Sequence, residues 1–322
     1  MTGIKDIAKK ANVSISTVSY ALNNSSKVSE KTRKRILMIA DEMNYIPNRA
    51  GQNLRRKQTR IIGVHLSSYS GSFYGDLLDG IHNMAKELGF DIIACSGEKS
   101  RLFLPQGMID GIIVLDQYYP DEQLLKYAEE GHSIVVLDRQ LEHENIRHVL
   151  LDNQEGMKQA VQSLKSSPVE VIDIIGGPKG NFDSKERLKT ATQEISKLGK
   201  KFRIYKGEFT EESGYLAARE IAAEAKKQSG LQAKKIQIIA LNDEMGIGAY
   251  NYFKNSSLNT ETEVKIIGFD NLVVSRYLDP KMHSVTYSKR EWGAVGMNTL
   301  YKMLNGERGK DALISTKFSA NQ

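Results

Sequence analysis

Apolar side chains recur at helical spacing three times within the first 46 residues. The first stretch has them at the i, i+3, i+4 and i+7 positions of one helix face, namely Ile4, Ile7, Ala8 and Ala11. The second follows Ser14, which can cap a helix, and runs to about Leu22. The third follows Ser29 and ends before Pro47, because a residue that precedes proline is pushed away from helical angles. Residues 1–46 are therefore expected to form three short helices around a small core.

Beyond Arg60 the pattern changes to short β-branched runs separated by helix-sized intervals. These runs occupy residues 61–66, 91–95, 111–115, 133–137, 171–175, 202–205, 236–241 and 264–269. Such alternation is typical of parallel sheets with crossover helices. The rhythm occurs twice, with a break near residues 152–156, and the short interval 97–108 leaves no room for a full helix. We expect an α/β body of two doubly wound halves, with a ligand between them at the carboxyl ends of the strands.

Charge is unevenly distributed along the chain. Of its 45 Lys and Arg residues, 13 lie within the first 60 positions, against 4 of the 39 acidic residues. The rest of the chain therefore holds 32 basic and 35 acidic residues. A basic module joined to a slightly acidic body indicates a head that binds a polyanion. A basic tail without function is the alternative, but the helical spacing and the caps indicate a folded head.

Composition excludes several classes of protein. No run approaches the ~18–20 apolar residues that a membrane span needs, and the first residues lack the apolar segment of a secretion signal. The single Cys95 excludes an internal disulfide, and the six histidines are scattered without metal-ligand spacing. We expect a cytoplasmic protein that has no metal, no cofactor and no contact with a membrane.

Enzymatic motifs are also missing. The glycine-rich stretch 176–180 lacks the G-x-x-x-x-G-K-[ST] pattern of a phosphate loop, and no G-x-S-x-G elbow occurs. We therefore expect a protein that is not an enzyme. A transport-type sugar-binding protein is a second alternative for the body, but the basic head argues against it.

Two short helices joined by a tight turn, with a third to close the core, predict a helix-turn-helix module, whose second helix enters the DNA major groove. Side chains able to meet base edges lie on the exposed face of that helix: Ile15, Ser16, Ser19 and Tyr20. Side chains placed to hold phosphates are Ser14, Thr17, Asn23, Lys27, Ser29 and Thr32. Each hydroxyl among them, taken alone, is better interpreted as a helix cap or a solvated side chain, and it is the helix pattern together with the charge that favours DNA.

The order of several motifs in this region resembles the LacI/GalR family of bacterial transcription repressors. The family's D-[IV]-A, V-S-x-x-T-V-S, L-N, V-S-x-x-T-[RK], L/M-N-Y-x-P-N and I-G-V elements occur in sequence within residues 6–64. The resemblance implies that Ile15, Ser16 and Tyr20 occupy the base-reading positions. Most members of the family have arginine where this chain has Tyr20, so no half-site sequence is assigned.

Residues 47–60 are compatible with a short helix that is marginal alone in water. Gly51 lowers its stability further, by roughly 1 kcal/mol relative to alanine. The resemblance implies a hinge helix that pairs with its twin in the minor groove, where Leu54 wedges between base steps. The hinge residues assigned to DNA are Asn48, Arg49, Ala50, Gln52, Asn53 and Leu54. A flexible linker is the alternative.

Polar and aromatic side chains follow the ends of several expected strands, where they suit a sugar, whose hydroxyls need paired partners and whose ring stacks on aromatics. These are Ser68, Ser70, Phe73, Asp138, Asn242, Asp243 and Asp270. The resemblance extends over nearly the whole chain and implies a periplasmic-binding-protein-like body in which Arg187, Phe209, Asp243 and Phe73 contact the effector. Without it, Arg187 would be interpreted as a surface charge and Phe209 as a core aromatic.

We therefore predict a transcriptional regulator, acting as a repressor, that binds a palindromic operator as a homodimer, with a tetramer left open. A sugar or sugar phosphate bound between the body halves would release it from DNA. The expected domains are the helix-turn-helix head (1–46), the hinge (47–60) and the effector and dimerisation domain (61–322). The halves of the last are expected at about 61–155 plus 285–322, and at about 156–284. The alternative is a catabolite-control regulator whose corepressor is a phosphorylated carrier protein.

Overall fold

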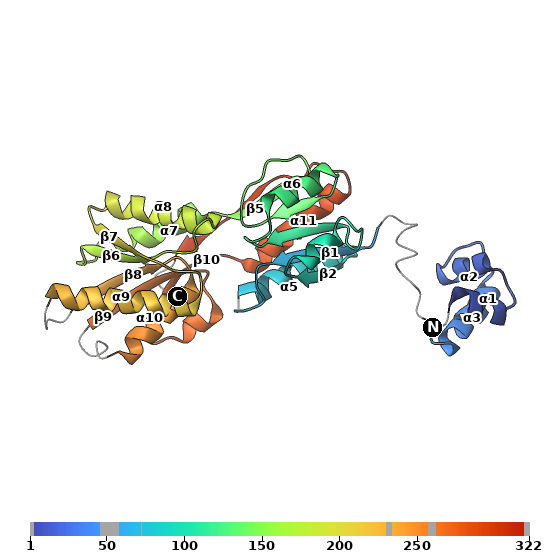
Figure 1. Ribbon diagram of the computed structural model, residues 1–322, viewed down its shortest axis with the longest axis horizontal. Coiled ribbons are helices and arrows are strands. Elements are labelled where there is room, and N and C mark those ends of the chain that lie inside the picture. The colour runs from blue at the N-terminus through green and yellow to red at the C-terminus, as the bar shows by residue number, and fades with distance from the viewer. Residues whose placement is uncertain (1–2, 46–57, 72, 230–233, 257–261, 319–322) are drawn as a thin grey trace. The chain divides into compact units, whose positions relative to one another are not determined.

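The computed structural model describes residues 3–45, 58–71, 73–229, 234–256 and 262–318 (Figure 1). Its internal contacts divide the chain into two units, Met1–Thr59 and Arg60–Gln322. The division falls where the hydrophobic pattern and the charge of the sequence change.

The first unit contains the helices α1 (Ile4–Lys10), α2 (Ile15–Leu22) and α3 (Glu30–Glu42). Ile7, Val18 and Ile36, one from each helix, are fully buried and form its core. The hydroxyls of Ser14 and Ser29 cap α2 and α3 by accepting hydrogen bonds from backbone N–H groups at 3.1 and 3.3 Å. The expected helix-turn-helix head is confirmed.

In the described part of the second unit, the first sheet has the strand order β11-β5-β4-β3-β1-β2, with all neighbours parallel. Its strands are β1 (Ile61–Leu66), β2 (Asp91–Cys95), β3 (Gly111–Leu115), β4 (Ile134–Val136), β5 (Ile146–Leu151) and β11 (Ala312–Ile314). Its helices are α5 (Phe73–Glu87), η1 (Lys99–Phe103), α6 (Asp121–Glu129) and α11 (Lys289–Leu304). Ile113 packs in the same cluster as side chains of α5 and α11, whereas Ile112 packs with α6. Helices therefore cover both faces, and the short interval before β3 holds only the 3-10 helix η1.

The second sheet has the order β12-β10-β9-β8-β6-β7. Its strands are β6 (Val171–Ile175), β7 (Lys201–Tyr205), β8 (Lys234–Ala240), β9 (Thr262–Phe269), β10 (His283–Thr286) and β12 (Lys317–Phe318), of which β12 alone is antiparallel to its neighbour. Its helices are α7 (Asn153–Gln162), α8 (Phe182–Lys197), α9 (Glu211–Ser229), α10 (Asp243–Asn255) and η2 (Val273–Tyr277). The two sheets confirm the expected body of two doubly wound α/β halves (Figure 1).

In the part of the body that the structure describes, the chain passes between the halves three times: after β5, after β10 and after β11. The expectation that residues 285–322 all belong to the first half is therefore wrong for β12, which pairs with β10 of the second sheet. Its two residues are too few for a strand pattern to be visible in the sequence.

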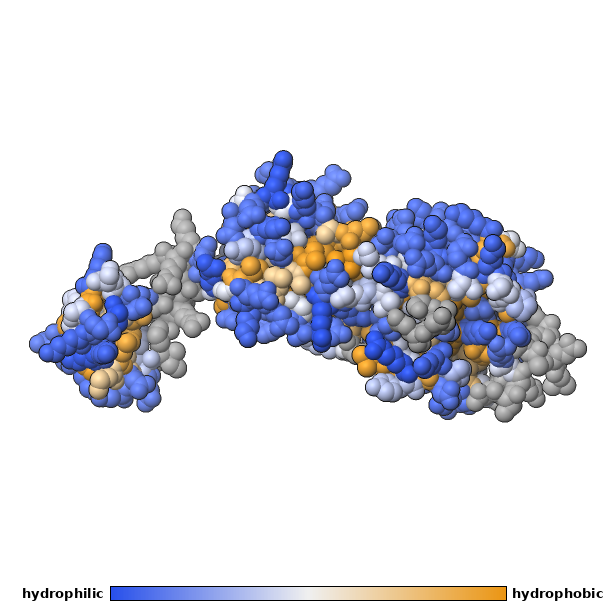
Figure 2. Space-filling view, turned by 180° about the vertical axis from the view of Figure 1, so that it is seen from behind, coloured by the Kyte–Doolittle hydropathy of each residue, from blue (hydrophilic) through white to orange (hydrophobic). Residues whose placement is uncertain are grey.

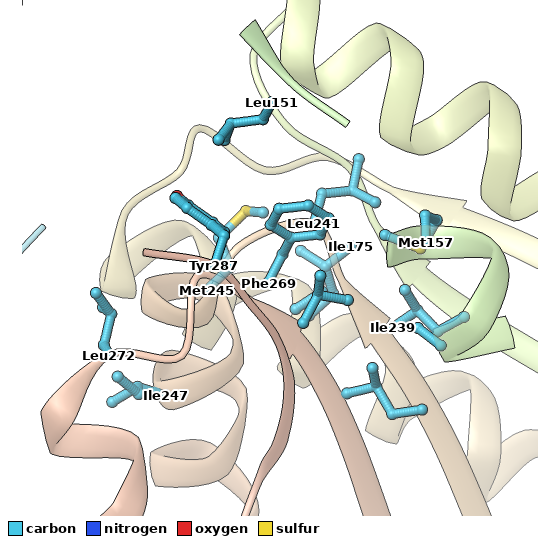
Figure 3. Close-up of a cluster of buried hydrophobic side chains, with 14 of the residues drawn as sticks. Leu151, Met157, Ile175, Ile239, Leu241, Met245, Ile247, Phe269, Leu272 and Tyr287 are labelled. Carbon is cyan, nitrogen blue, oxygen red and sulfur yellow. The ribbon is translucent and has the colours of Figure 1, made fainter. Parts of the chain in front are cut away.

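The buried core continues through the crossover region. Leu151 and Tyr287, which lie at two of the crossings, belong to the same cluster as Phe269 and Leu241 of the second half (Figure 3). The rings of Phe269 and Tyr287 are 6.1 Å apart. Trp292 of α11 is fully buried, and its Nε1 donates to the Val149 carbonyl of β5 at 2.6 Å. The two halves are therefore joined by a continuous apolar core.

Candidate functional site

The exposed face of α2 carries two large side chains, one aliphatic and one aromatic. Ile15 is 46% exposed and Tyr20 39% exposed, whereas Val18 on the opposite face is fully buried. The ammonium of Lys27 lies 5.1 Å from the centre of the Tyr20 ring, so the ring is held beside a positive charge. Ser16 is also exposed, and Ser19 is partly buried. The predicted base-reading residues therefore lie on one accessible surface.

The predicted phosphate-contacting residues lie around the two helix starts and the loop between α2 and α3. Ser14 bonds to both Ser16 and Thr17 through their hydroxyls at 2.8 Å, and Ser29 bonds to Thr32 at 2.9 Å. Asn23 turns inward, because its amide donates to the Ser19 carbonyl at 2.8 Å. Backbone N–H groups at a helix start attract anions, so the positions suit phosphates. The predicted hinge contacts lie outside the described residues: Asn48, Arg49, Ala50, Gln52, Asn53 and Leu54.

A cavity of about 280 Å³ lies between the two halves of the body. Its lining includes these predicted residues: Ser68, Ser70, Phe73, Asp138, Arg187, Phe209, Asn242 and Asp270. The loop after β1 and the end of β4 supply side chains from the first half, and α8, α10 and the loops after β7 and β9 supply those from the second. A ligand here would touch both halves at once.

Sequence reasoning missed several other residues of the lining: Tyr74, Leu115, Gln117, Tyr118, Asn181, Asp183, Glu208, Thr210, Glu244 and Leu272. The spacing of Asp183 could have identified it, since it lies four residues before Arg187 and therefore on the same helix face. Gln117 and Tyr118 directly follow β3, and the rule for strand ends would have included them.

Arg187 is buried at the centre of this lining. Its Nε donates to Oδ1 of Asn153 at 2.7 Å, and its Nη1 donates to the Leu241 carbonyl at 2.9 Å. Nη1 also lies 3.8 Å from the Asp270 carboxylate. The guanidinium stacks on Phe269, with 3.6 Å between its carbon and the ring centre. Its position is therefore fixed by four groups.

The carboxyl groups around Arg187 are strongly desolvated. Burial raises the pKa of Asp138 to about 7, although Arg139 beside it acts in the opposite direction. Burial also raises the pKa of Asp183 and that of Asp270, against the attraction of Arg187. Oδ1 of Asp183 accepts a hydrogen bond from the Asn153 amide at 2.7 Å. Carboxyl groups in this state can accept, or once protonated donate, hydrogen bonds to a ligand.

Phe209 is held at the cavity by its own backbone. It has a φ of 59°, and its carbonyl accepts a hydrogen bond from the Asn242 amide at 3.2 Å. The Asn242 oxygen also caps α10 by accepting from Met245 N–H at 3.0 Å. Any side chain at position 177 would meet the Phe209 ring, so Gly177 leaves room for it. Asn242 therefore orients Phe209 as well as lining the cavity.

Asp243 is the one predicted effector residue that does not line the cavity. It is fully buried, and its carboxylate accepts from Leu272 N–H at 2.7 Å and from the Ser284 hydroxyl at 2.6 Å. Burial raises its pKa to about 7. The assignment of Asp243 to the effector is thus corrected: it anchors the loop that follows β9.

A larger cavity, of 440 Å³, is formed by residues 271–286 alone and is lined by Arg276, Lys281 and His283 among others. Because it draws on one segment of the second half, the central cavity is the better candidate for a ligand that couples the halves. Within the described residues, no group of three His, Cys, Asp or Glu side chains could hold a metal ion. No helix in that part of the chain is long and apolar enough to cross a membrane.

Two family models match the chain. "Bacterial regulatory proteins, lacI family" matches residues 3–48, and "Periplasmic binding protein-like domain" matches residues 161–318. A solved sugar-binding transcriptional regulator of the LacI family from Enterococcus faecalis is 41% identical, with a TM-score of 0.75, over 82% of this chain and 97% of its own.

Curated relatives also match over nearly the whole chain, among them the following two. The probable HTH-type transcriptional repressor ExuR of Bacillus subtilis is 29% identical over 95% of this chain and 92% of its own. Catabolite control protein A of Priestia megaterium is 28% identical over 97% and 95%. The first of these is named as a transcriptional repressor and the matching family model as one of regulatory proteins, in agreement with the expectation that the chain is not an enzyme.

Proposed function

The chain belongs to the lacI family of bacterial regulatory proteins, and on that premise we propose that it is a repressor whose hold on a palindromic operator is controlled by a small sugar-type effector. The central cavity carries this proposal, because its polar lining comes from both halves of the body. A ligand that bridges Asp138 of the first half and Arg187 of the second favours one angle between the halves over others. Such a ligand shifts the population of states only if it binds one of them better.

Operator binding is assigned to the head. Tyr20, Ile15 and Ser16 on the exposed face of α2 would read bases, and hydroxyls at the starts of α2 and α3 would hold phosphates. Residues 47–60 would act as the hinge, with Leu54 as the wedge. Effector binding would separate the paired hinges and release the DNA. One head offers few base contacts, so two copies related by a two-fold axis are needed for specificity.

A homodimer is supported by exposed apolar side chains on the body. The face of the body that Figure 2 shows is mostly hydrophilic with separate apolar patches. On η2, Val273, Val274 and Tyr277 are 52%, 46% and 83% exposed. Contiguous apolar side chains on a surface mark protein contacts, and we assign η2 to the contact with a second copy.

The test is selection of bound fragments from a random duplex pool, at two salt concentrations, with and without a mixed sugar panel. The expected result is an enriched palindrome that is lost when one sugar is present. Binding that weakens with salt equally for all sequences would contradict sequence-specific repression.

A second candidate is catabolite control, favoured by the relative that bears the name catabolite control protein A. A phosphorylated carrier protein would then act as corepressor. If operator affinity rises with that protein and responds to no sugar, this candidate replaces the first.

A further inference from the structure

The charges around the central cavity are unbalanced. Among its described lining residues, five are acidic and one is basic: Asp138, Asp183, Glu208, Glu244 and Asp270 against Arg187. We propose that the effector is a polyhydroxyl compound without negative charge, and that the cavity rejects the phosphorylated and carboxylated counterparts of its own ligand. This inference rests on the proposed function, because it narrows the effector of the same site.

Arg187 is poorly placed to receive an anion. Two of its three nitrogens already donate, to Asn153 and to the Leu241 carbonyl, and Asp270 lies 3.8 Å away. One face of the guanidinium is covered by Phe269. Bidentate binding of a phosphate or carboxylate needs two N–H donors on the same edge of the guanidinium, both free of other partners. Arg187 would have to leave these partners to provide it.

The neighbouring cations are directed at other groups. Arg139 bonds to the carboxylates of Asp138 and Asp121 at 2.9 and 2.6 Å. Lys206 pairs with Glu208 at 3.0 Å. Lys289 donates to the backbone carbonyl of Asp270 and does not belong to the described lining. These contacts lower the negative charge of the cavity but present no free cation to a ligand.

Two carboxylates of the lining, Asp183 and Glu244, form no ion pair with another described residue. Asp183 is bonded by the neutral amide of Asn153. Glu244 lies against Gly71 of the loop after β1, where any added side chain would collide with it. Burial raises the pKa of Glu244, and repulsion from Asp270 and Glu211 raises it further. The carboxyl groups thus already repel one another, and an anionic ligand would add to that repulsion.

Hydroxyl groups suit the same lining. Carboxylate oxygens accept from hydroxyls, and the amides of Gln117, Asn181 and Asn242 can both donate and accept. The rings of Phe73 and Phe209 offer apolar faces for the C–H side of a sugar. The volume of about 280 Å³ lies at the low end for ligand sites, which favours a small sugar over a large conjugate.

The test uses the full chain and follows its thermal unfolding midpoint with matched sets of sugars. Each set contains a neutral mono- or disaccharide, its phosphate, its uronic acid and its amino derivative. At least one neutral parent should raise the midpoint saturably. Its phosphate and uronic acid should bind about tenfold more weakly or worse, and its amino derivative should still bind.

An anionic member that binds more tightly than its neutral parent overturns the inference but leaves a sugar-responsive regulator in place. If no member of any set binds, the proposed function fails together with the inference. These two failures are therefore distinguishable.

A charge variant localises the effect. Glu244→Gln removes one negative charge with little change of shape, and Glu220→Gln removes one from an exposed position of α9 outside the lining. The first should improve the affinity for the phosphate relative to the neutral parent by about threefold or more, and the second should leave that ratio unchanged. If both variants shift the ratio equally, or neither does, the cavity charges do not select the ligand.

Discussion

The guanidinium carbon of Arg187 lies 3.6 Å from the centre of the Phe269 ring, so an α8 side chain is stacked on the last residue of β9. The same guanidinium donates to Asn153 at the start of α7. One side chain of the cavity lining therefore connects three elements, and its stacking partner Phe269 belongs to the apolar cluster of Figure 3. We therefore expect that a ligand that moves Arg187 would also shift Phe269, which packs with Tyr287 at a crossing between the two halves.

Replacing Arg187 tests its role in the response to the effector. Arg187→Lys keeps the charge but loses the flat stacking face and the fork of donors. We expect about a tenfold or greater loss of affinity for the sugar that raises the unfolding midpoint, with operator affinity in the absence of sugar within about twofold of the wild type. Calorimetric titration and an operator-binding assay measure the two.

Arg187→Ala is a harsher change, because it leaves Asp270 buried without its ion-pair partner and removes the attraction that Arg187 exerts on the buried Asp183. A loss on the order of 3–5 kcal/mol in the free energy of unfolding is expected. The matched control is Arg219→Lys on the exposed surface of α9. An unchanged sugar response in folded Arg187→Lys would show that the cavity is not the effector site.

Asp243 offers a contrast between anchoring and ligand contact. Because its carboxylate accepts from Leu272 N–H and the Ser284 hydroxyl, Asp243→Ala should cost about 2–4 kcal/mol of stability by leaving both donors unsatisfied. Asp243→Asn keeps an acceptor and should leave sugar affinity within about threefold. Asp183→Asn, inside the lining, should reduce it at least about tenfold. Equal losses of affinity in the two asparagine variants would restore Asp243 as a direct contact.

The sequence predicts some of these relationships and not others, for physical reasons. The strand β3 is a continuous apolar run and is visible locally, whereas β5 contains Arg147 and His148. Arg147 is accommodated in the strand because its Nε donates to the Gly309 carbonyl at 2.6 Å. His148 is accommodated because its backbone N–H donates to the Asp311 carboxylate at 2.8 Å. Those partners lie more than 160 positions away, so no local pattern reveals the strand.

The same distinction explains the cavity. Sheet geometry alone places Asp138 at the carboxyl edge of the first sheet, and Asn242 and Asp270 at the carboxyl edge of the second. Which way Asp243 points depends on Ser284 in β10, a strand too short and polar to be predicted. The family resemblance supplied Arg187, whose burial rests on Asn153 and Phe269 from distant elements.

Tyr20 tests the DNA-reading surface. Its ring is 39% exposed and lies beside the Lys27 ammonium. Tyr20→Ala should relax the base preference at one position of each half-site by ~1–3 kcal/mol, whereas Lys27→Ala should weaken binding to all sequences alike. Met38→Ala, 65% exposed on α3, is the control and should change neither. An unchanged base preference in Tyr20→Ala would remove this residue from the reading surface.

Tyr277 tests the assignment of η2 to the dimer. It is 83% exposed, and a buried tyrosine is often a dominant contact in protein interfaces. Tyr277→Glu should weaken dimerisation by about 2 kcal/mol, or about 30-fold, as measured by sedimentation over a range of concentrations. Leu313→Glu, 61% exposed on β11, is the matched control. If Leu313→Glu disrupts the dimer and Tyr277→Glu does not, the contact lies elsewhere.

Asp138 makes the stability of the body depend on pH. The pKa of its carboxyl group is raised by burial to about 7, with Asp183 and Asp116 adding repulsion and Arg139 opposing it. In the unfolded chain the group loses its proton near pH 4. Between about pH 4 and pH 7 the folded protein thus binds more protons than the unfolded one, and its stability falls as pH rises through this window.

Asp138→Asn should abolish that contribution, so the variant should gain stability over the wild type between pH 5 and pH 8. The gain is on the order of 2–4 kcal/mol. Urea unfolding at four pH values measures it, with the exposed Asp91→Asn as the control. Asp243 shares a pKa raised to about 7, so part of the pH dependence should persist in Asp138→Asn and become smaller in the double variant, where Asp183, Asp270 and Glu244 still contribute. A difference between wild type and Asp138→Asn that stays constant from pH 5 to pH 8 would mean that Asp138 is ionised throughout in the folded protein.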